Sequence, residues 1–187
     1  MKKQPIEAGK LLRCLGVTVL VVLIDQLTKF LAVRYLAPVD TVPLIRDVLH
    51  LTYCTNPGAA FGMLADHRAI FLIISVIAIL GMGFLMCLFH RAHPLFTVSL
   101  AMIVGGGIGN MIDRIFVGEV VDFIDFRLIN FAIFNGADSF VTVGCVLLAV
   151  YLLFIDGRTE TPIFRPDAPK TKEPSGEETG DGEKGDE

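Results

Sequence analysis

The sequence has no tryptophan, only four histidines and no stretch in which basic residues are concentrated. Residues 156–187 contain ten acidic and five basic residues, so the net negative charge belongs to this C-terminal segment. The rest of the chain has a net charge of about +1, spread over its whole length. Because nucleic-acid binding needs Lys and Arg clustered on one face, we expect no nucleic-acid partner.

Cysteine is also sparse, and its spacing excludes two classes of small-protein scaffold. Neither a CxxC pair nor a Cys/His cluster occurs, so neither a disulfide framework nor a zinc site is indicated. We interpret the cysteines as small apolar residues. The four lie far apart, three of them within apolar runs: Cys14, Cys54, Cys87 and Cys145.

Apolar residues, by contrast, are abundant. They make up 53% of the 187 residues, and the mean hydropathy of +0.63 is above what the core of a soluble domain needs. Each membrane crossing takes roughly 20 apolar residues, so a chain of this length holds a few spans. We predict an all-α membrane protein whose four transmembrane helices cover about residues 11–36, 69–89, 95–112 and 139–155.

The two ends of the chain differ in character. A charged segment followed by an apolar run begins the sequence like a secretory signal, but no A-x-A cleavage site follows, so we expect the first span to remain in place. Residues 1–155 then form one membrane domain. Residues 156–187 are rich in Pro, Gly, Glu and Lys and predict a disordered, acidic tail.

Basic residues near the span ends predict the orientation. They precede the first span, separate the second from the third, and follow the fourth, which puts both termini in the cytoplasm. These residues are Lys2, Lys3, Lys10, Arg13, His90, Arg91, Arg158 and Arg165. Residues 37–68 form the first outer loop, where mixed apolar and polar residues predict a small extracytoplasmic region with short strands.

Ionisable side chains also occur at or near membrane depth, where each costs several kcal/mol and is a functional candidate by default. In chain order they are Asp25, Lys29, Asp113, Arg114, Asp122, Asp125 and Asp138. Structural roles compete with functional ones. Asp25 and Lys29, at i and i+4, predict an ion pair that ends the first span with Lys29 directed toward the interface, or a pair in which Asp25 orients a catalytic loop.

The second charged pair has its own structural interpretation. Adjacent Asp113 and Arg114 would mark the point where the third span leaves the bilayer. The glycines just before them, at 105, 106, 107 and 109, predict a small-residue face for close helix packing. They are not a dinucleotide-binding motif, because no strand precedes them.

The remaining acids suggest hydrolysis. Two carboxylates held close together share a proton, so one can activate water while the other donates to a carbonyl. Spacing permits Asp122 to pair with Asp125, on one face of a helix, or with Asp138, if the third and fourth spans are neighbours. The residues alone do not choose between these pairs.

Several alternatives stay open at this stage. Carboxylates could hold Mg²⁺, although no histidine lies near. Ser139 could act as a nucleophile, but it would need a basic partner. A proton-coupled transporter would also use acids at membrane depth, yet the last two spans do not repeat the first two. A purely structural membrane subunit would use the acids as helix-end anchors.

Five motifs in order resemble one family. DQLTKF at 25–30, NPGAAFG at 56–62, GNMIDR at 109–114, VVDFIDF at 120–126 and FNGADS at 134–139 together resemble the bacterial lipoprotein signal peptidases, or signal peptidase II. The resemblance runs from about residue 11 to residue 155. Any one motif alone would be weak, whereas the ordered combination is highly specific.

This resemblance implies a four-span aspartic protease of the bacterial inner membrane, with its active site near the outer leaflet. It implies cleavage of prolipoproteins on the amino side of a diacylglyceryl-modified cysteine. The catalytic pair falls on Asp122 and Asp138. Supporting roles fall on Asp25, Lys29, Asn56, Asn110, Asp113, Arg114 and Asn135.

The resemblance further implies a small outer sheet and a mobile helix between Ala37 and Arg68. We expect no metal and no cofactor, membrane lipid as the surroundings, inhibition by a globomycin-type cyclic lipopeptide, and a monomer. The chain departs from the family at Gly136, where an apolar branched residue is usual. A glycine there would loosen the backbone just before Asp138.

Overall fold

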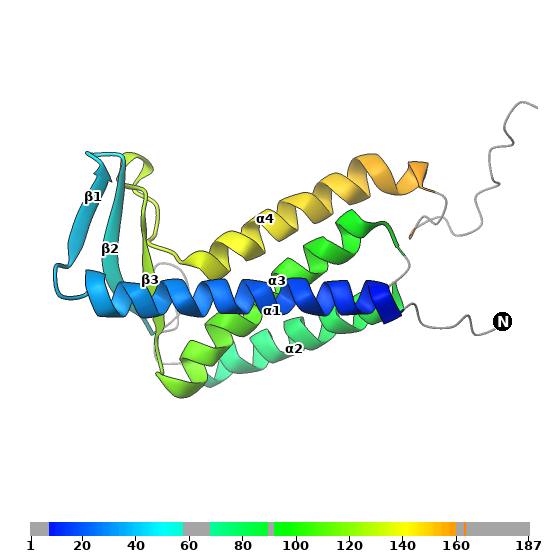
Figure 1. Ribbon diagram of the computed structural model, residues 1–187, viewed down its shortest axis with the longest axis horizontal. Coiled ribbons are helices and arrows are strands. Elements are labelled where there is room, and N and C mark those ends of the chain that lie inside the picture. Colours follow the sequence, from blue (N-terminus) through cyan, green and yellow to red (C-terminus); the bar gives the residue numbers. More distant parts are fainter. Residues whose placement is uncertain (1–7, 58–67, 90–91, 160–162, 164–187) are drawn as a thin grey trace, which may run out of the picture.

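The computed structural model describes residues 8–57, 68–89, 92–159 and 163. In these ranges the chain forms long helices in a bundle, with a small sheet at one end (Figure 1). The helices are α1 (Ala8–Leu31), extended by a π-helical turn (Ala32–Leu36), α2 (Arg68–Leu88), α3 (Pro94–Phe116), and α4 (Gly136–Val150), extended by turns over Tyr151–Ile155 and Asp156–Arg158. The strands are β1 (Thr41–Ile45), β2 (Leu49–Asn56) and β3 (Val120–Asp125).

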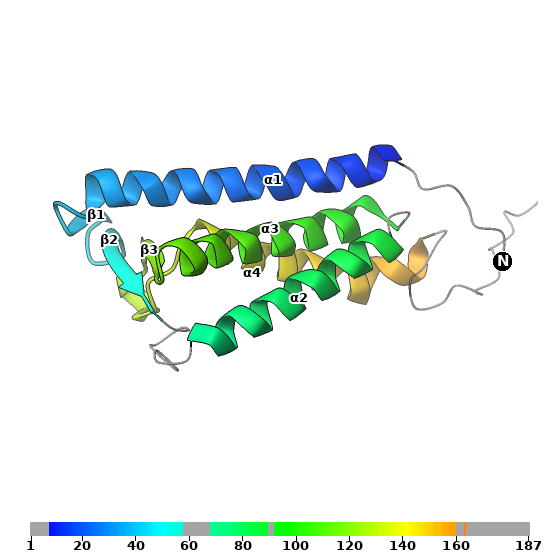
Figure 2. The ribbon, with the colours of Figure 1, turned by 90° about the horizontal axis from the view of Figure 1, so that it is seen from below.

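Helix α3 lies at the centre and packs on each of the other three helices, as Figure 2 shows for α1 and α2 on either side of it. Its glycines make this close approach possible. A Cβ at Gly105 would meet Val21 of α1, one at Gly106 would meet Val141 of α4, and one at Gly107 would meet Ile79 of α2. The predicted small-residue face is confirmed, and it serves three different neighbours.

Three of the helices are long and apolar enough to cross a membrane: residues Ala8–Leu36, Pro94–Phe116 and Gly136–Arg158. In α2 the apolar stretch within the described side chains runs over Leu72–Leu88. Helix α3 continues beyond the expected end at residue 112, so Asp113 and Arg114 lie within the helix. Whether these two residues mark the point of exit from the bilayer stays a prediction.

The sheet is antiparallel, in the order β1-β2-β3, and its strands run across the direction of the helices (Figure 1). The first two strands confirm the predicted β-structure in the outer loop. The third strand follows α3 and pairs with β2, with Cys54 opposite Asp122 and His50 opposite Asp125. The condition under which Asp122 and Asp125 would share a helix face is thus not met, because this segment is β3.

The opposite end of the bundle has its own apolar core, built from Ala92, Phe96, Leu100 and Tyr151. The first residues of α1 and the last turn of α4 both lie at this end, away from the sheet (Figure 1). The tail predicted for residues 156–187 begins with an ordered turn over Asp156–Arg158, in which Asp156 is buried, and nearly all of its remaining residues lie outside the described ranges. Of the loop between Ala37 and Arg68, which is expected to hold a mobile helix, residues 58–67 lie outside them as well.

Candidate active site

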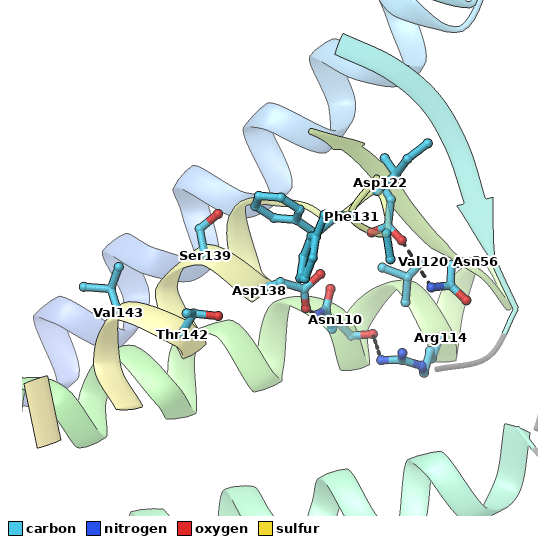
Figure 3. Close-up of a pocket in the computed structure, with 13 residues that line it drawn as sticks. Asn56, Asn110, Arg114, Val120, Asp122, Phe131, Asp138, Ser139, Thr142 and Val143 are labelled. Atoms are coloured by element: carbon cyan, nitrogen blue, oxygen red, sulfur yellow. Dashed lines mark hydrogen bonds between the residues drawn. The ribbon is translucent and has the colours of Figure 1, made fainter. Parts of the chain in front are cut away.

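A cavity of about 400 Å³ opens where the end of α3, the start of α4 and the ends of β2 and β3 meet. We call it the catalytic cavity. Its polar wall comes from Asn56, Asn110, Arg114, Asp122 and Asp138, and Figure 3 shows these side chains around one space. Apolar side chains such as Phe131, Phe134 and Val143 complete the lining. Five of the predicted site residues are therefore brought together around one cavity.

Asp122 is only 3% exposed, and amide groups hold both of its oxygens. Asn135 Nδ2 donates to Asp122 Oδ1 at 2.6 Å, and Asn56 Nδ2 donates to Oδ2 at 3.3 Å. Burial and the negative charge of Asp138 raise the pKa of Asp122 to about 6, against the lowering effect of the two amides and of Lys29. Asp122 thus changes charge close to neutral pH.

Asp138 is positioned by the first turn of α4. Asn135 caps this helix by accepting a hydrogen bond from the Asp138 backbone N–H at 3.0 Å, while the Asp138 carboxylate accepts from the Asn135 N–H at 3.4 Å. Asn110 of α3 donates to Asp138 Oδ1 at 2.7 Å. Asn135, which caps α4, also donates to Asp122 and so links the two carboxylates.

Lys29 determines how the asparagines are turned. Its ammonium group has only donors and bonds Asn110 Oδ1 at 2.9 Å, so the amide nitrogen of Asn110 must face Asp138. Asn135 Nδ2 donates to the same Asn110 Oδ1 at 3.0 Å. Asp122 and Asp138 each accept an N–H from an asparagine side chain. The buried ammonium group of Lys29 determines how both asparagines are oriented.

Lys29 itself is 3% exposed and lies between two acids, with Nζ 2.8 Å from both Asp25 Oδ2 and Asp113 Oδ2. Asp25 is fully buried, and its other oxygen accepts the Ala137 backbone N–H at 2.8 Å. The ion pair between Asp25 and Lys29 is confirmed, but Lys29 does not extend to the interface. Asp25 instead fixes the start of α4, next to Asp138.

Gln26 is a site residue that the sequence analysis missed. Its Nε2 lies 2.9 Å from Asp113 Oδ1, 3.2 Å from Asp25 Oδ2 and 3.2 Å from the Gly109 carbonyl oxygen. Asp25 and Asp113 share the ammonium group of Lys29, and the Gln26 amide donates further hydrogen bonds to both carboxylates. Its position three residues before Lys29, on the same helix face, was the available signal.

A family model of signal peptidase (SPase) II matches residues 17–154. The chain belongs to the signal peptidase II family. A lipoprotein signal peptidase from Caldanaerobacter subterraneus subsp. tengcongensis is 45% identical over 137 residues, which are 73% of this chain and 93% of that protein. The one from Clostridioides difficile is 40% identical over 144 residues, 76% and 96% of the two chains. A solved bacterial membrane enzyme is 32% identical with a TM-score of 0.66, covering 83% of this chain and 99% of its own.

As a member of signal peptidase II, the chain is a peptidase and a multi-pass protein of the bacterial inner membrane.

The acids of this signal peptidase II do not all serve one site. Asp122 and Asp125 are three residues apart on a strand and so point to opposite faces. Asp125 Oδ2 accepts from Thr52 at 2.8 Å and from Arg127 at 2.9 Å. Burial raises the pKa of Asp125, but these hydrogen bonds outweigh it and hold that pKa below its ordinary value.

The other candidates in this signal peptidase II have less suitable surroundings. Ser139 lines the catalytic cavity, but its hydroxyl donates to the Asn135 carbonyl oxygen at 2.9 Å. Within the described ranges, no three His, Cys, Asp or Glu side chains form a group that could hold a metal ion. Arg114 lines the cavity and donates to the Asn110 carbonyl oxygen at 3.3 Å. The acids with a shared cavity and a shared amide network are Asp122 and Asp138.

Proposed function

We propose that Asp122 and Asp138 are the catalytic pair with which this chain removes signal peptides from prolipoproteins, on the amino side of a diacylglyceryl-modified cysteine. The observation that supports this most directly is the hydrogen-bonded link from Asp122 through Asn135 and Asn110 to Asp138, around one cavity. Family membership supports the substrate, because the named relatives are lipoprotein signal peptidases.

The chemistry follows from two carboxylates that hold one proton between them. The ionised member takes a proton from a bound water, whose oxygen attacks the scissile carbonyl carbon while the protonated member donates to the carbonyl oxygen. The tetrahedral intermediate then collapses, the C–N bond breaks, and the departing amine takes up a proton. No covalent enzyme intermediate forms. The macroscopic pKa values belong to the pair, so the first base is a property of both acids.

The other polar residues keep this pair in place. Asn110 and Asn135 aim N–H groups at the two carboxylates, and Asn56 adds one to Asp122. Lys29, Asp25 and Asp113 form the buried ionic group behind them. Arg114 supplies a positive charge to the cavity wall, suited to a substrate carbonyl group.

Strand pairing supports the four-span topology that we propose. Strands β2 and β3 belong to one sheet and therefore lie on the same side of the membrane. Among the described residues between these strands, the helices are α2 and α3, so if α3 crosses the bilayer, α2 should cross it too. The 21 residues of α2 would extend about 30 Å, which matches a hydrocarbon core. Single crossings by α1 and α4 then place both termini on the opposite side, in the cytoplasm, with the site outward.

This arrangement lets the diacylglyceryl chains of the substrate stay in the bilayer while the scissile bond reaches water and two acids. We further propose that the chain acts as a monomer, since both acids and their partners come from one chain. A globomycin-type cyclic lipopeptide would compete for the catalytic cavity, because it combines a peptide backbone with a lipid chain.

Single replacements test the catalytic pair. We expect Asp122→Asn and Asp138→Asn each to lower kcat for a diacylglyceryl-modified precursor by about 10²–10⁴-fold, because an amide can neither accept the water proton nor supply one. Cleavage would be measured with purified protein in lipid bilayers.

The matched control is Asp47→Asn, an exposed acid in the turn between β1 and β2 whose φ of 60° an asparagine tolerates. It should keep full activity. All three variants should insert and unfold like the wild type, because they change one atom group each. Full cleavage by either active-site variant would refute the assignment.

A further inference from the structure

A second cavity lies on the other side of Asp122 from the membrane-spanning part of the site. It measures about 340 Å³, and among the described residues its walls are Cys54, Thr55, Asn56, Pro57, Asp122, Ala132 and Ile133. We call it the sheet-side cavity. It shares Asn56, Asp122, Ala132 and Ile133 with the catalytic cavity. Asp122 therefore stands between two spaces, and a substrate bound over it has room on both sides.

The two cavities lie at different depths. The catalytic cavity continues along α4 past Ser139 to Thr142 and Val143, away from the sheet and toward the middle of the bundle (Figure 3). The sheet-side cavity is formed by the last residues of β2 and by the segment that leads to α4. One space thus opens beside a spanning helix, and the other opens beneath the sheet.

The substrate has three branches that meet at the modified cysteine. The signal peptide and the diacylglyceryl group are apolar and remain in lipid, whereas the mature chain leaves the membrane. We infer that the sheet-side cavity binds the first residues of the mature chain, directly after the lipid-modified cysteine. This inference rests on the proposed function, and it assigns the catalytic cavity to the two apolar branches.

The walls of the sheet-side cavity predict what it accepts. Cys54 lies directly opposite Asp122 in the strand pair, so the two side chains are neighbours on one face. Burial and the charge of Asp122 raise the pKa of the Cys54 thiol, so this wall is uncharged at neutral pH. Thr55 and Ala132 are also small, so the lining leaves this space of about 340 Å³ open. The cavity should therefore accept a bulky aromatic residue after the modified cysteine, which fills it better than a small residue does.

Two precursors that differ only in this residue test the inference. Both carry the same signal peptide and diacylglyceryl-cysteine, followed by Gly in one and Trp in the other. We expect the wild type to cleave the Trp precursor with a kcat/KM about 10-fold higher, because the indole buries apolar area that Gly lacks. Cys54→Leu should reduce this preference by filling the cavity, and Cys54→Ala should not reduce it, with the change mostly in KM.

Cys145→Leu is the matched control, because Cys145 is an exposed residue of α4 outside both cavities. It should leave the Gly-to-Trp ratio unchanged. An equal ratio in the wild type and all variants would overturn the inference while leaving the proposed function intact, because both precursors would still be cleaved. Failure of the wild type to cleave either precursor would instead refute the proposed function.

Thiol modification gives a second test, which compares two adducts of one protein. Methyl or benzyl methanethiosulfonate would transfer its alkylthio group to the Cys54 thiol, forming a mixed disulfide and releasing methanesulfinate, in folded protein whose other three cysteines are replaced by serine. The benzyl group should slow the Trp precursor more than the Gly precursor, and the methyl group should have the smaller effect. Equal slowing of both precursors by both groups would contradict a binding role for this cavity.

Discussion

Asp122 is held in surroundings that oppose its charge. It is almost completely buried beside a second carboxylate, and only two amide donors and the more distant Lys29 favour the ionised form. These effects leave the pKa of Asp122 near 6, where a small change in the surroundings alters the fraction ionised. The fraction of molecules in which Asp122 and Asp138, the proposed catalytic pair, hold one proton between them is therefore expected to change around neutral pH.

The pH dependence of cleavage should reflect this raised pKa. As pH rises through about 6, Asp122 loses its proton while Asp138 is ionised, no protonated acid remains to donate to the scissile carbonyl, and kcat/KM should decline there. Asn56→Ala removes one donor that lowers this pKa and should move the decline to higher pH. Profiles measured from about pH 4 to pH 8 would show the shift.

The comparison variant for this experiment is Asp47→Asn, whose profile should coincide with that of the wild type. A decline with rising pH that begins near pH 4 in all three proteins would mean that Asp122 titrates like a carboxyl group in water. In that case its burial would have no consequence for the reaction.

The sequence singled out residues that the structure brings together around one cavity, but it could not predict the directions of their side chains. A charged pair at i and i+4 predicts the contact between Asp25 and Lys29, because one helix determines it. Whether Lys29 turns outward or inward depends on Asn110 and Asp113, which belong to another helix. Spacing likewise could not separate Asp125 from Asp138 as the partner of Asp122, since the answer depends on whether residues 120–125 form a strand or a helix.

At the level of elements, the glycines of α3 and the glycine that begins α4 have opposite roles. A Cβ at Gly109 would collide with the carboxylate of Asp25, so the absence of a side chain allows that buried acid to lie against α3. A Cβ at Gly136 would meet Thr28 Oγ1 at 3.4 Å and Asp25 Oδ1 at 3.6 Å, which is ordinary contact. Of these two glycines, Gly109 is the one that packing requires.

Alanine at these two positions should therefore act in opposite directions. We expect Gly109→Ala to destabilise the protein by about 1–3 kcal/mol and to reduce cleavage, because Asp25 and α4 must shift. Gly136→Ala should stabilise it by about 0.4–1 kcal/mol, because the unfolded chain loses freedom while the first turn of the helix accepts the methyl group. Thermal unfolding in one detergent would measure both.

Each variant of the glycine pair serves as the control for the other, since both add one methyl group. A destabilising Gly136→Ala would mean that the glycine at this departure from the family is needed for the backbone. A neutral Gly109→Ala would mean that Asp25 has room to move, contrary to the contact described above.

Long apolar helices were predictable from the sequence, whereas β3 was not. Each span carries its own signal in about 20 consecutive apolar residues. The segment Val120–Asp125 is short and forms a strand because β2, some 65 residues earlier, offers it an edge. A local pattern does not contain that partner, so the position of Asp122 on a strand became visible only with the sheet.

The whole molecule divides its tasks between its two ends. The sheet lies at one end of the bundle, while the first turn of α1 and the last turn of α4 lie at the other (Figure 1). The ends of β2 and β3 line the catalytic cavity and the sheet-side cavity. Since β2 and β3 must share a side, the number of crossings between them is even, and the orientation of the entire bundle follows from locating any one loop. Basic residues near the chain ends predict that the sheet faces outward.

Single cysteines at the two ends would locate these sides directly. In a chain whose four native cysteines are replaced by serine, Asp47→Cys marks the exposed turn of the sheet, and Gly157→Cys marks the far end, where a Cβ meets nothing within 4 Å. A membrane-impermeant maleimide should label the first in intact cells and the second only after permeabilisation. The reverse pattern would invert the orientation, and labelling of both in intact cells would contradict a bundle that spans the bilayer with its site at one face.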